Sequence, residues 1–370
     1  MSDIADLSKG IGISKDQLSA DGEPCILYGE LYTKYKSETI KEVISKTNID
    51  NTKLVKSKAN DVIIPCSGET AEEIATARCV LKDDVLLGGD LNIIRLHGYD
   101  GSFMSYQLNG KRKYDIAKVA QGVSVVHLYG EHLKNIKTFN PSLNEQKKIA
   151  NLLSLLDERI STQNKIIEKL QSLIKGISNR LLYADNRMSI RIEEMLIERS
   201  ERTKKNNQYE ILSSTVNGIF SQRDYFSKDI ASDNNVGYKI IHLYDIVLSP
   251  QNLWMGNINF NDKFDIGIVS PSYKVFSIAD GFDKKYVAAL LKTHHALYNY
   301  MLVSEQGAST VRRNLNYEAF EQLVFKIPSL NKQQEIGHVI SLLKSQLENA
   351  NLLIKTYNSQ KQYLLRQMFI

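Results

Sequence analysis

Residues 143–182 carry the sequence LNEQKKIANLLSLLDERISTQNKIIEKLQSLIKGISNRLL. Apolar side chains recur in it in alternating steps of four and three, which is the heptad spacing of a helix that pairs along its length. The seam positions are Ile149, Leu153, Leu156, Ile160, Gln163, Ile167, Leu170, Ile174, Ile177 and Leu181. A helix of about 40 residues would be roughly 60 Å long at ~1.5 Å per residue, and such a helix needs a partner.

The same pattern returns 187 residues later, in residues 330–369. The phrase Pro141-Ser142-Leu143-Asn144 opens the first copy and recurs as Pro328-Ser329-Leu330-Asn331 in the second, and Gln146 recurs as Gln333. The second seam consists of Ile336, Ile340, Leu343, Leu347, Ala350, Ile354, Tyr357, Lys361, Leu364 and Met368. Two matched seams in one chain predict that the helices pair with each other as an antiparallel coiled coil. Pairing between two chains is the alternative, because heptads do not identify the chain that supplies the partner.

The chain has 370 residues, a formal net charge of +5 and a sequence pI of about 8.8. This basic balance permits an anionic partner such as DNA but does not require one. Cys25, Cys66 and Cys79 are an odd count without a Cys-x-x-Cys pair, which favours neither a disulfide framework nor a zinc ribbon. The sequence has no leader-like amino terminus, and no apolar segment approaches the ~18 residues of a membrane span. We therefore expect a soluble, cytoplasmic protein.

The repeat divides the chain into four segments. We expect a globular domain in residues 1–140, a long helix in 141–185, a second globular domain in 186–327 and a second long helix in 328–370. Short strand-like runs alternate with turns in both globular segments. The expected class is α+β, with two similar mixed α/β domains separated by two long helices and related by a pseudo-twofold internal repeat.

Short sequences correspond between the two globular segments, but the loops that follow them do not. The corresponding pairs are Asp61-Val62-Ile63-Ile64 with Asp245-Ile246-Val247-Leu248, and Gln121-Gly122-Val123-Ser124 with Gln306-Gly307-Ala308-Ser309. After the first pair, residues 66–70 are CSGET whereas residues 251–255 are QNLWM. A repeated frame with unlike loops suits a protein that reads two different targets at a fixed separation. Drift of surface loops after a duplication would give the same pattern.

The order of a globular domain, a long helix opened by Pro-Ser-Leu-Asn-x-Gln-x-x-Ile, a second globular domain and a second such helix resembles the specificity (S) subunit of type I restriction-modification systems. The resemblance covers essentially the whole chain. It extends to Gly29-Glu30-Leu31-Tyr32-Thr33 in the first domain and to Glu198-Arg199-Ser200-Glu201-Arg202-Thr203 in the second. The very short lead before Ile4 departs from the family pattern.

This resemblance implies a role for each segment. Each globular domain would be a target recognition domain that reads one half of a bipartite site in double-stranded DNA. The helices would dock two modification (methyltransferase) subunits and, through the complex, restriction (translocase/nuclease) subunits. S-adenosylmethionine, ATP and Mg would belong to those partners, so no cofactor is expected on this chain. Apolar residues outside the seam would suit such docking, namely Leu152, Leu155, Leu173, Val339 and Leu342.

Polar side chains on the loops are the candidates for reading DNA, because they donate or accept hydrogen bonds at base edges. In the first domain the candidates are Tyr32, Lys34, Ser67, Glu69, Thr70, Lys111, Arg112 and Lys113, and the last three suit phosphate contacts equally well. In the second domain they are Gln251, Asn252, Trp254, Ser272, Tyr273, Lys274, Arg312, Arg313 and Asn314. For each, a solvated surface position is an equally good interpretation.

Catalytic motifs are missing from the sequence. The single Gly-Lys pair, Gly110-Lys111, has Ser105 where a phosphate-binding loop requires its first glycine. There is no Asn-Pro-Pro-aromatic methyltransferase motif, and the seven histidines show no metal-ligand spacing. We expect a non-catalytic subunit of a DNA methyltransferase and ATP-dependent endonuclease. The alternative is a non-enzymatic coiled-coil adaptor that binds protein partners.

Overall fold

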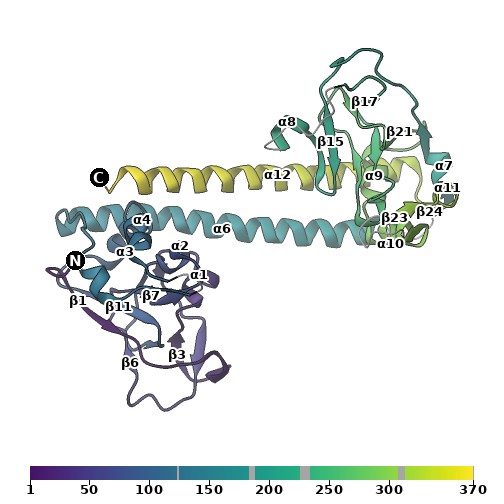
Figure 1. The fold of residues 1–370 in the computed structure, drawn as a ribbon. Helices are drawn as coiled ribbons and strands as arrows, with labels where there is room; N and C mark the ends of the chain where they lie inside the picture. The colour runs from purple at the N-terminus through teal and green to yellow at the C-terminus, as the bar shows by residue number, and fades with distance from the viewer. Residues whose placement is uncertain (123–124, 183–187, 226–233, 307–312, 370) are drawn as a thin grey trace. The chain divides into compact units, whose positions relative to one another are not determined.

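The computed structural model describes residues 1–122, 125–182, 188–225, 234–306 and 313–369. Its contacts form two compact units: unit 1 comprises Met1–Ile166 with Ala350–Ile370, and unit 2 comprises Ile167–Asn349. The long helices α6 (Leu143–Leu182) and α12 (Leu330–Gln367) each contribute one part to each unit (Figure 1).

Unit 1 is built on two five-stranded sheets. The first has the order β1-β11-β7-β9-β4 and is antiparallel except for the parallel pair β4 and β9. Its strands are β1 (Ala5–Lys9), β11 (Leu91–Leu96), β7 (Asp61–Pro65), β9 (Arg78–Val80) and β4 (Thr39–Ile40). The second has the order β2-β5-β3-β10-β6, with β2 (Leu18–Ser19), β5 (Ser45–Thr47), β3 (Glu23–Ile26), β10 (Leu86–Leu87) and β6 (Val55–Lys56). A separate ladder joins β8 (Ser67–Gly68) to β12 (Val126–His127).

Short helices cover the first sheet of unit 1. They are α1 (Glu30–Thr33), α2 (Ala71–Ile74), α3 (Gly101–Asn109), α4 (Lys113–Val119) and α5 (Gly130–Lys134), with a 3-10 turn η1 (Lys15–Gln17). Helix α3 lies between the sheet and α6, because Met104 and Leu108 pack into the sheet core while Phe103 and Tyr106 pack against the long helices. This short helix therefore attaches the sheet to the helix pair.

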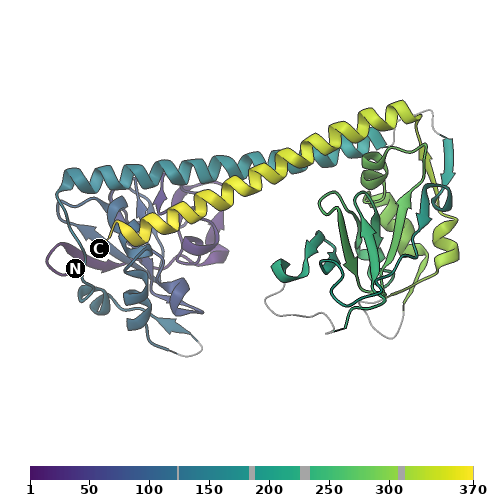
Figure 2. The same cartoon turned by 90° about the horizontal axis from the view of Figure 1, so that it is seen from above.

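The two long helices run antiparallel within unit 1 (Figures 1 and 2). Leu153 of α6 packs in one apolar cluster with Leu365 of α12. Further along α6, Gln163 Nε2 donates a hydrogen bond to Ala350 O (3.2 Å). Residue numbers thus rise along α6 as they fall along α12. The predicted pairing of the two helices within one chain is confirmed.

Unit 2 repeats the first sheet of unit 1 with fewer strands. Its main sheet has the order β14-β21-β18-β19 and is antiparallel. The strands are β14 (Leu196–Glu198), β21 (Lys274–Ile278), β18 (Ile246–Leu248) and β19 (Ile258–Phe260). Two-stranded ladders join β13 (Met188–Arg191) to β24 (Val324–Ile327), β15 (Leu212–Thr215) to β16 (Gly218–Ser221), β17 (Lys239–His242) to β20 (Ile266–Val269) and β22 (Ser304–Gln306) to β23 (Arg313–Leu315). The short helices are α7 (Ile192–Met195), α8 (Gln222–Tyr225), α9 (Lys284–Leu290), α10 (His294–Leu302) and α11 (Tyr317–Glu321), with a 3-10 turn η2 (Leu253–Met255).

The repeated phrase at the start of each long helix has the same structural role in both units. Gln146 Oε1 accepts from Asp100 N (2.9 Å) while its Nε2 donates to Pro141 O (2.7 Å). Gln333 makes the same two hydrogen bonds in unit 2, from Asp283 N (3.1 Å) and to Pro328 O (2.9 Å). Both aspartates also cap a short helix, α3 in unit 1 and α9 in unit 2. The glutamine of the repeated phrase therefore attaches a short helix of each domain to its long helix. The predicted internal repeat is confirmed.

Candidate nucleic-acid interface

The central strand of each main sheet is fixed at its start by a buried aspartate. In unit 1, Asp61 accepts two hydrogen bonds from the Arg95 guanidinium, at 2.9 and 2.7 Å. In unit 2, Asp245 accepts from Arg199 Nε at 2.9 Å. Burial raises the pKa of the Asp245 carboxyl, although its hydrogen bonds and the charge of Arg199 act in the opposite direction. The ion pairs thus lie at the start of β7 and of β18, whereas the loops that differ between the halves follow the ends of these strands.

In unit 1 the loop after β7 pairs with the segment that follows Gln121-Gly122. Ser67 is opposite His127 in the β8–β12 ladder, and Leu128 N donates to Cys66 O (2.8 Å). Ser67 is buried, whereas Glu69 and Thr70 are exposed. Thr70 caps α2 by accepting from Glu73 N (3.2 Å). Of these three predicted residues, Glu69 thus has the freest side chain, while Ser67 and Thr70 have structural roles.

Tyr32 lies near Glu69 although it is distant in sequence. Partial burial raises the pKa of the Tyr32 phenol, and the charges of Glu73 and Glu69 add to this effect. Lys113, the first residue of α4, lies near Glu72 of α2; burial and the charge of Arg78 lower the pKa of its ammonium, against the smaller effect of Glu72. The fold therefore gathers Tyr32, Glu69 and Lys113 around α2.

Lys34 and the rest of the predicted basic cluster are placed differently. The Lys34 ammonium is bound to Glu30 (2.6 Å) and to Ser45 Oγ (2.8 Å), so it stabilises α1. Arg112 contacts Asp115 at 3.4 Å, and Lys111 is exposed. Gly110, just before them, lies so close to α12 that a Cβ there would be 2.9 Å from Leu365 O. The turn with Lys111 and Arg112 thus lies beside the long helix.

Sequence reasoning missed a cluster of aromatic and basic side chains at the end of β7. Lys9 of β1 is opposite Asn92, which is opposite Ile64 near the end of β7. The Lys9 ammonium lies 5.6 Å from the centroid of the Tyr129 ring, and that ring stacks on His127 at 6.2 Å. Lys9, His127 and Tyr129 are all exposed. The alternation of buried Val126 and Leu128 with exposed His127 and Tyr129 is a signal that could have identified the last two.

In unit 2 the loop after β18 is joined to the β22–β23 hairpin. Arg313 N donates to Gln251 O (3.1 Å), and the Arg313 guanidinium lies over the Trp254 ring at 4.6 Å from its centroid. Asn314 is exposed beside Arg313, and Gln251 is exposed on the loop. Asn252 is half-buried and precedes η2. The structure therefore brings five of the predicted residues together from two separate segments.

Three further predicted residues of unit 2 lie where the turn after β20 enters β21: Ser272 and Tyr273 on the turn and Lys274 at the first position of β21. Lys274 is opposite Leu248, the last residue of β18, so this turn lies at the same edge of the sheet as Gln251. The Lys274 ammonium is bound to both carboxylate oxygens of Glu198 (2.9 Å each) and lies 4.0 Å from the Tyr317 ring centroid. Burial opposes ionisation of Glu198, but hydrogen bonds from Lys274 and Tyr317 outweigh it and lower its pKa.

Two other residues of this turn differ in exposure. Tyr273 OH donates to Ser214 O (3.0 Å), whereas Ser272 is exposed and contacts Ser270. Arg312 lies outside the described residues, as does part of each Gln-Gly-x-Ser sequence. In the described part of the chain, no group of three or more His, Cys, Asp or Glu side chains could hold a metal ion. The described helices include none that is long and apolar enough to span a membrane.

Comparison with known proteins shows which proteins this chain is similar to. A family model described as the type I restriction modification DNA specificity domain matches residues 1–172. The specificity subunit of the type I restriction enzyme MjaVIII from Methanocaldococcus jannaschii is 30% identical over 179 residues, which are 48% of this chain. The match spans 40% of that relative's length.

Two solved structures share the fold. The S subunit of a type I restriction-modification system from M. genitalium superposes with a TM-score of 0.64 at 16% identity, covering 100% of this chain and 94% of that one. A chain from a structural study of assembly and conformational transition in the type I system gives a TM-score of 0.52 at 12% identity, covering 98% and 95%. Residues 1–172 thus match the type I restriction modification DNA specificity domain, and the chain as a whole shares its fold with a solved S subunit of such a system.

Proposed function

We propose that this chain is the non-catalytic DNA-reading subunit of a type I restriction-modification complex, and that each unit reads one half of a bipartite site. One observation carries the proposal. The same central strand, β7 in unit 1 and β18 in unit 2, ends in side chains of unlike chemistry on an otherwise repeated frame. Loops of this kind, held by a rigid sheet, suit the reading of two different base sequences.

The side chains of unit 2 favour purine edges. Gln and Asn pair with adenine through two hydrogen bonds, and Arg pairs with guanine in the same way. Gln251, Asn314 and Arg313 lie together at the end of β18, and the Trp254 ring restricts the Arg313 guanidinium. An arginine held in this way loses less conformational freedom when it binds a base.

Unit 1 offers a different set of side chains at the equivalent edge. Glu69 can accept a hydrogen bond from a cytosine amino group, and Lys9 can neutralise a phosphate. His127 and Tyr129 add exposed rings beside them. We propose that these residues, and not Lys34 or Thr70, make the direct DNA contacts of unit 1.

Mapping of methylated adenines in cells that carry this chain with its modification partner tests the proposal. Gln251→Ala or Asn314→Ala should relax one half-site only, with a loss of about 1–3 kcal/mol of discrimination at one base pair. Glu69→Ala should relax the other half-site. Lys332→Ala, at an exposed helix position, is the matched control and should leave both half-sites unchanged. Methylation without a defined bipartite site would contradict the proposal.

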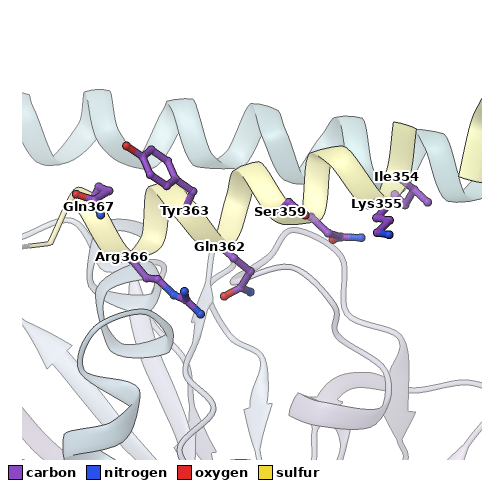
Figure 3. Close-up of a pocket in the computed structure, with 8 residues that line it drawn as sticks. Ile354, Lys355, Ser359, Gln362, Tyr363, Arg366 and Gln367 are labelled. Carbon is purple, nitrogen blue, oxygen red and sulfur yellow. The ribbon is translucent and has the colours of Figure 1, made fainter. Parts of the chain in front are cut away.

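The long helices carry a second, repeated feature that supports docking of partner subunits. Exposed apolar residues recur at the repeat spacing: Leu152 with Val339, Leu155 with Leu342, and Ile166 with Leu353. A surface groove of about 770 Å³ lies along one side of α12, next to Tyr363, which is 63% exposed (Figure 3). In unit 2, a second groove lies along α6, and two of its lining residues, Ser172 and Gly176, correspond at the repeat spacing to Ser359 and Tyr363 of the first groove. We propose that each copy binds one modification subunit.

Stoichiometry tests this part of the proposal. Native mass spectrometry with a saturating modification partner should give two such subunits per chain. Leu155→Glu and Leu342→Glu should each remove one subunit, and the double variant should remove both. A one-to-one complex at saturation would refute two equivalent sites. We assign S-adenosylmethionine, ATP and Mg to the partner subunits of this complex.

A coiled-coil adaptor for protein ligands is the rival function, and salt distinguishes the two. DNA binding releases counterions, so the affinity of this chain for duplex DNA should fall steeply as the salt concentration rises. A fixed spacer should also matter, because a rigid helix pair would favour duplexes of one spacer length. Weak binding that is independent of both salt and spacer length would favour the adaptor.

A further inference from the structure

The helix pair of unit 1 contains a buried ionic cluster, which we call the seam cluster and define as Lys361, Asp157 and Glu38. The Lys361 ammonium lies 2.6 Å from Asp157 Oδ1 and 2.5 Å from Glu38 Oε2, and the three side chains are 11%, 8% and 8% exposed. Asp157 Oδ2 also accepts from Ser37 Oγ (2.9 Å) and Tyr106 OH (2.8 Å). One lysine of α12 thus bridges a carboxylate of α6 and one of the globular domain.

One contact of the helix pair joins equivalent positions of the two copies of the repeat. Gln163 and Ala350, joined by a hydrogen bond, are separated by 187 residues, which is the repeat spacing. Equivalent positions of the two copies therefore touch here. At the repeat spacing, Asp157 corresponds to Lys344 and Lys361 corresponds to Ile174. The seam cluster consequently has no ionic counterpart at the equivalent place in the repeat.

This asymmetry distinguishes the native pairing from its two alternatives. If the helix of the first copy paired with another first copy, Asp157 and Glu38 would face Ile174 and lose their lysine. If the second copy paired with another second copy, Lys361 would face Lys344. A buried carboxylate that loses its direct ion pair, or two facing ammonium groups, disfavours the contact strongly. Of the three pairings, the pairing of a first with a second copy is the one that brings a lysine to the two carboxylates.

We infer that the seam cluster is a pairing-specificity determinant: it directs α6 to pair with α12 and rejects pairing of either helix with its own kind. Heptad seams alone do not provide this discrimination, because the apolar positions of the two copies match. A single asymmetric polar contact in an apolar seam can select the partner at some cost in stability. The inference is independent of DNA binding, since it concerns only how the halves recognise each other.

Arg78 is a second cation near the two carboxylates, and its charge opposes the burial that raises the pKa of Glu38, but it forms no direct ion pair with either carboxylate in the described part of the chain. Its guanidinium is buried and donates to the carbonyl oxygens of Tyr35 (3.0 and 3.3 Å) and Ala77 (3.0 Å). In a pair of two first copies, each Asp157 would keep Ser37 and Tyr106 as hydrogen-bond donors but would have no direct ion pair. Lys361 is therefore the residue on which the discrimination depends.

A nicked form of the complete protein tests the inference. A protease site placed between Leu182 and Met188 allows the folded chain to be cut into its two halves, which then remain together in one sample. The cut protein is unfolded in denaturant and refolded by dilution, and native mass spectrometry counts mixed and like pairs. The unaltered sequence should give mixed pairs almost exclusively, whereas halves without discrimination would give like pairs as about half of the total. A yield of like pairs near half of the total would overturn the inference.

Ile174→Lys supplies the informative variant. It places a lysine opposite Asp157 and Glu38 in a pair of first copies, and opposite Lys344 in the mixed pair. Pairs of first copies should therefore rise by about tenfold or more, since about 1.4 kcal/mol gives a factor of ten. Ile177→Lys is the matched control, because it adds the same charge at the next seam position. It should weaken pairing without enriching pairs of first copies, and equal enrichment by both variants would overturn the inference.

A measurement on the uncut chain covers the case in which the halves do not refold. Asp157→Asn, Lys361→Met and the double variant form a thermodynamic cycle in denaturant unfolding. The inference requires strong coupling between Asp157 and Lys361. The folding equilibrium constant of the double variant should be at least ten times larger than the value expected if the effects of the two single variants simply multiplied. Additive effects would show that the cluster makes no selective contact and would overturn the inference.

Discussion

The two units attach a similar domain to a long helix by different chemistry. In unit 2, Ile336 and Ile340 of α12 belong to the main core of the domain, in contact with residues of α9. In unit 1, Ala150 and Leu153 of α6 form a smaller cluster that is separate from the sheet core, and the seam cluster adds buried ion pairs. One attachment is therefore mainly apolar, while the other combines a small apolar contact with charges.

Backbone proximity differs in the same way. Gly337 lies against the start of α9, where a Cβ would be 2.3 Å from Asp283 Oδ1 and 2.8 Å from Tyr286 N. The equivalent residue in unit 1 is Ala150, which packs beside Phe103. Unit 2 thus gains contact area by close approach, whereas unit 1 has room for a side chain. The comparison shows that the glutamine contacts preserve the orientation of the short helix while the surrounding contacts are free to change.

The largest expected effect comes from removing the lysine of the seam cluster. Lys361→Met removes the cation that pairs directly with the buried Asp157 and Glu38, which should lower the free energy of unfolding by about 3–5 kcal/mol. Burial already raises the pKa of Glu38, with Asp157 adding to the effect and Lys361 opposing it. Without Lys361 this pKa should rise further, so the folded state should bind a proton more tightly than the unfolded chain.

The pH dependence separates this cause from simple loss of packing. A carboxyl group with a raised pKa in the folded state contributes stability at low pH and loses it as the pH rises through that pKa. The deficit of Lys361→Met should therefore be largest at neutral pH and shrink as the pH falls toward 5. Chemical denaturation at several pH values measures this. Lys332→Met, at an exposed lysine of the same helix, is the control, and a deficit that does not change with pH would contradict the explanation.

Gly337→Ala tests the close approach in unit 2. The new Cβ would overlap Asp283 and the first turn of α9, so we expect a loss of about 1–3 kcal/mol despite the better helix propensity of alanine. Ala150→Gly at the equivalent position of unit 1 should cost only about 1 kcal/mol, through propensity. Thermal unfolding of both variants compares the two sites. A stabilised Gly337→Ala protein would show that the contact relaxes freely.

The glutamine contacts should be equally important in both units. Gln146→Leu and Gln333→Leu each remove two hydrogen bonds and leave a backbone N–H, of Asp100 or Asp283, without its partner. We expect a loss of about 1–3 kcal/mol in each case. Hydrogen exchange should show faster exchange at α3 in the first variant and at α9 in the second. Unequal losses would indicate that the surrounding contacts also determine the orientation of the short helices.

The sequence predicted the features that depend on repetition. Heptad spacing and the constant offset predicted both long helices and their antiparallel pairing, because apolar periodicity is a local signal. It did not predict the seam cluster, since Glu38 reaches Lys361 from a distance of 323 residues and no periodicity connects them. Gly337 gave no signal either, because a glycine within a helical pattern does not reveal what lies against it.

The candidate DNA-contacting residues divide in the same way. Gln251, Trp254 and Arg313 were candidates because such side chains on loops can contact DNA, and the fold brings them together. Lys34 and Thr70 have polar side chains of the right type, but local hydrogen bonds engage both. Lys9 escaped notice because its position depends on the pairing of β1 with β11. The type of a residue indicates whether its side chain can bind DNA. The pairing of the strands determines which of these side chains lie together at the end of the central strand.

The smallest expected effect concerns a pair of lysines near α12 in unit 2. The Lys292 ammonium donates to Asn259 Oδ1 (2.6 Å), and burial of this group together with the charge of Lys344 lowers its pKa from 10.5 to about 8. A lysine whose pKa is lowered destabilises the folded state below that pKa, and the penalty is relieved as the pH rises from about 8 toward 10.5. Lys344→Ala removes the charge but not the burial, so the pKa of Lys292 should rise part of the way to its ordinary value. NMR titration of dimethylated lysines measures this shift, with Lys332→Ala as the control. An unchanged pKa would mean that burial alone sets it, and the ionic difference between the units would then be limited to the seam cluster.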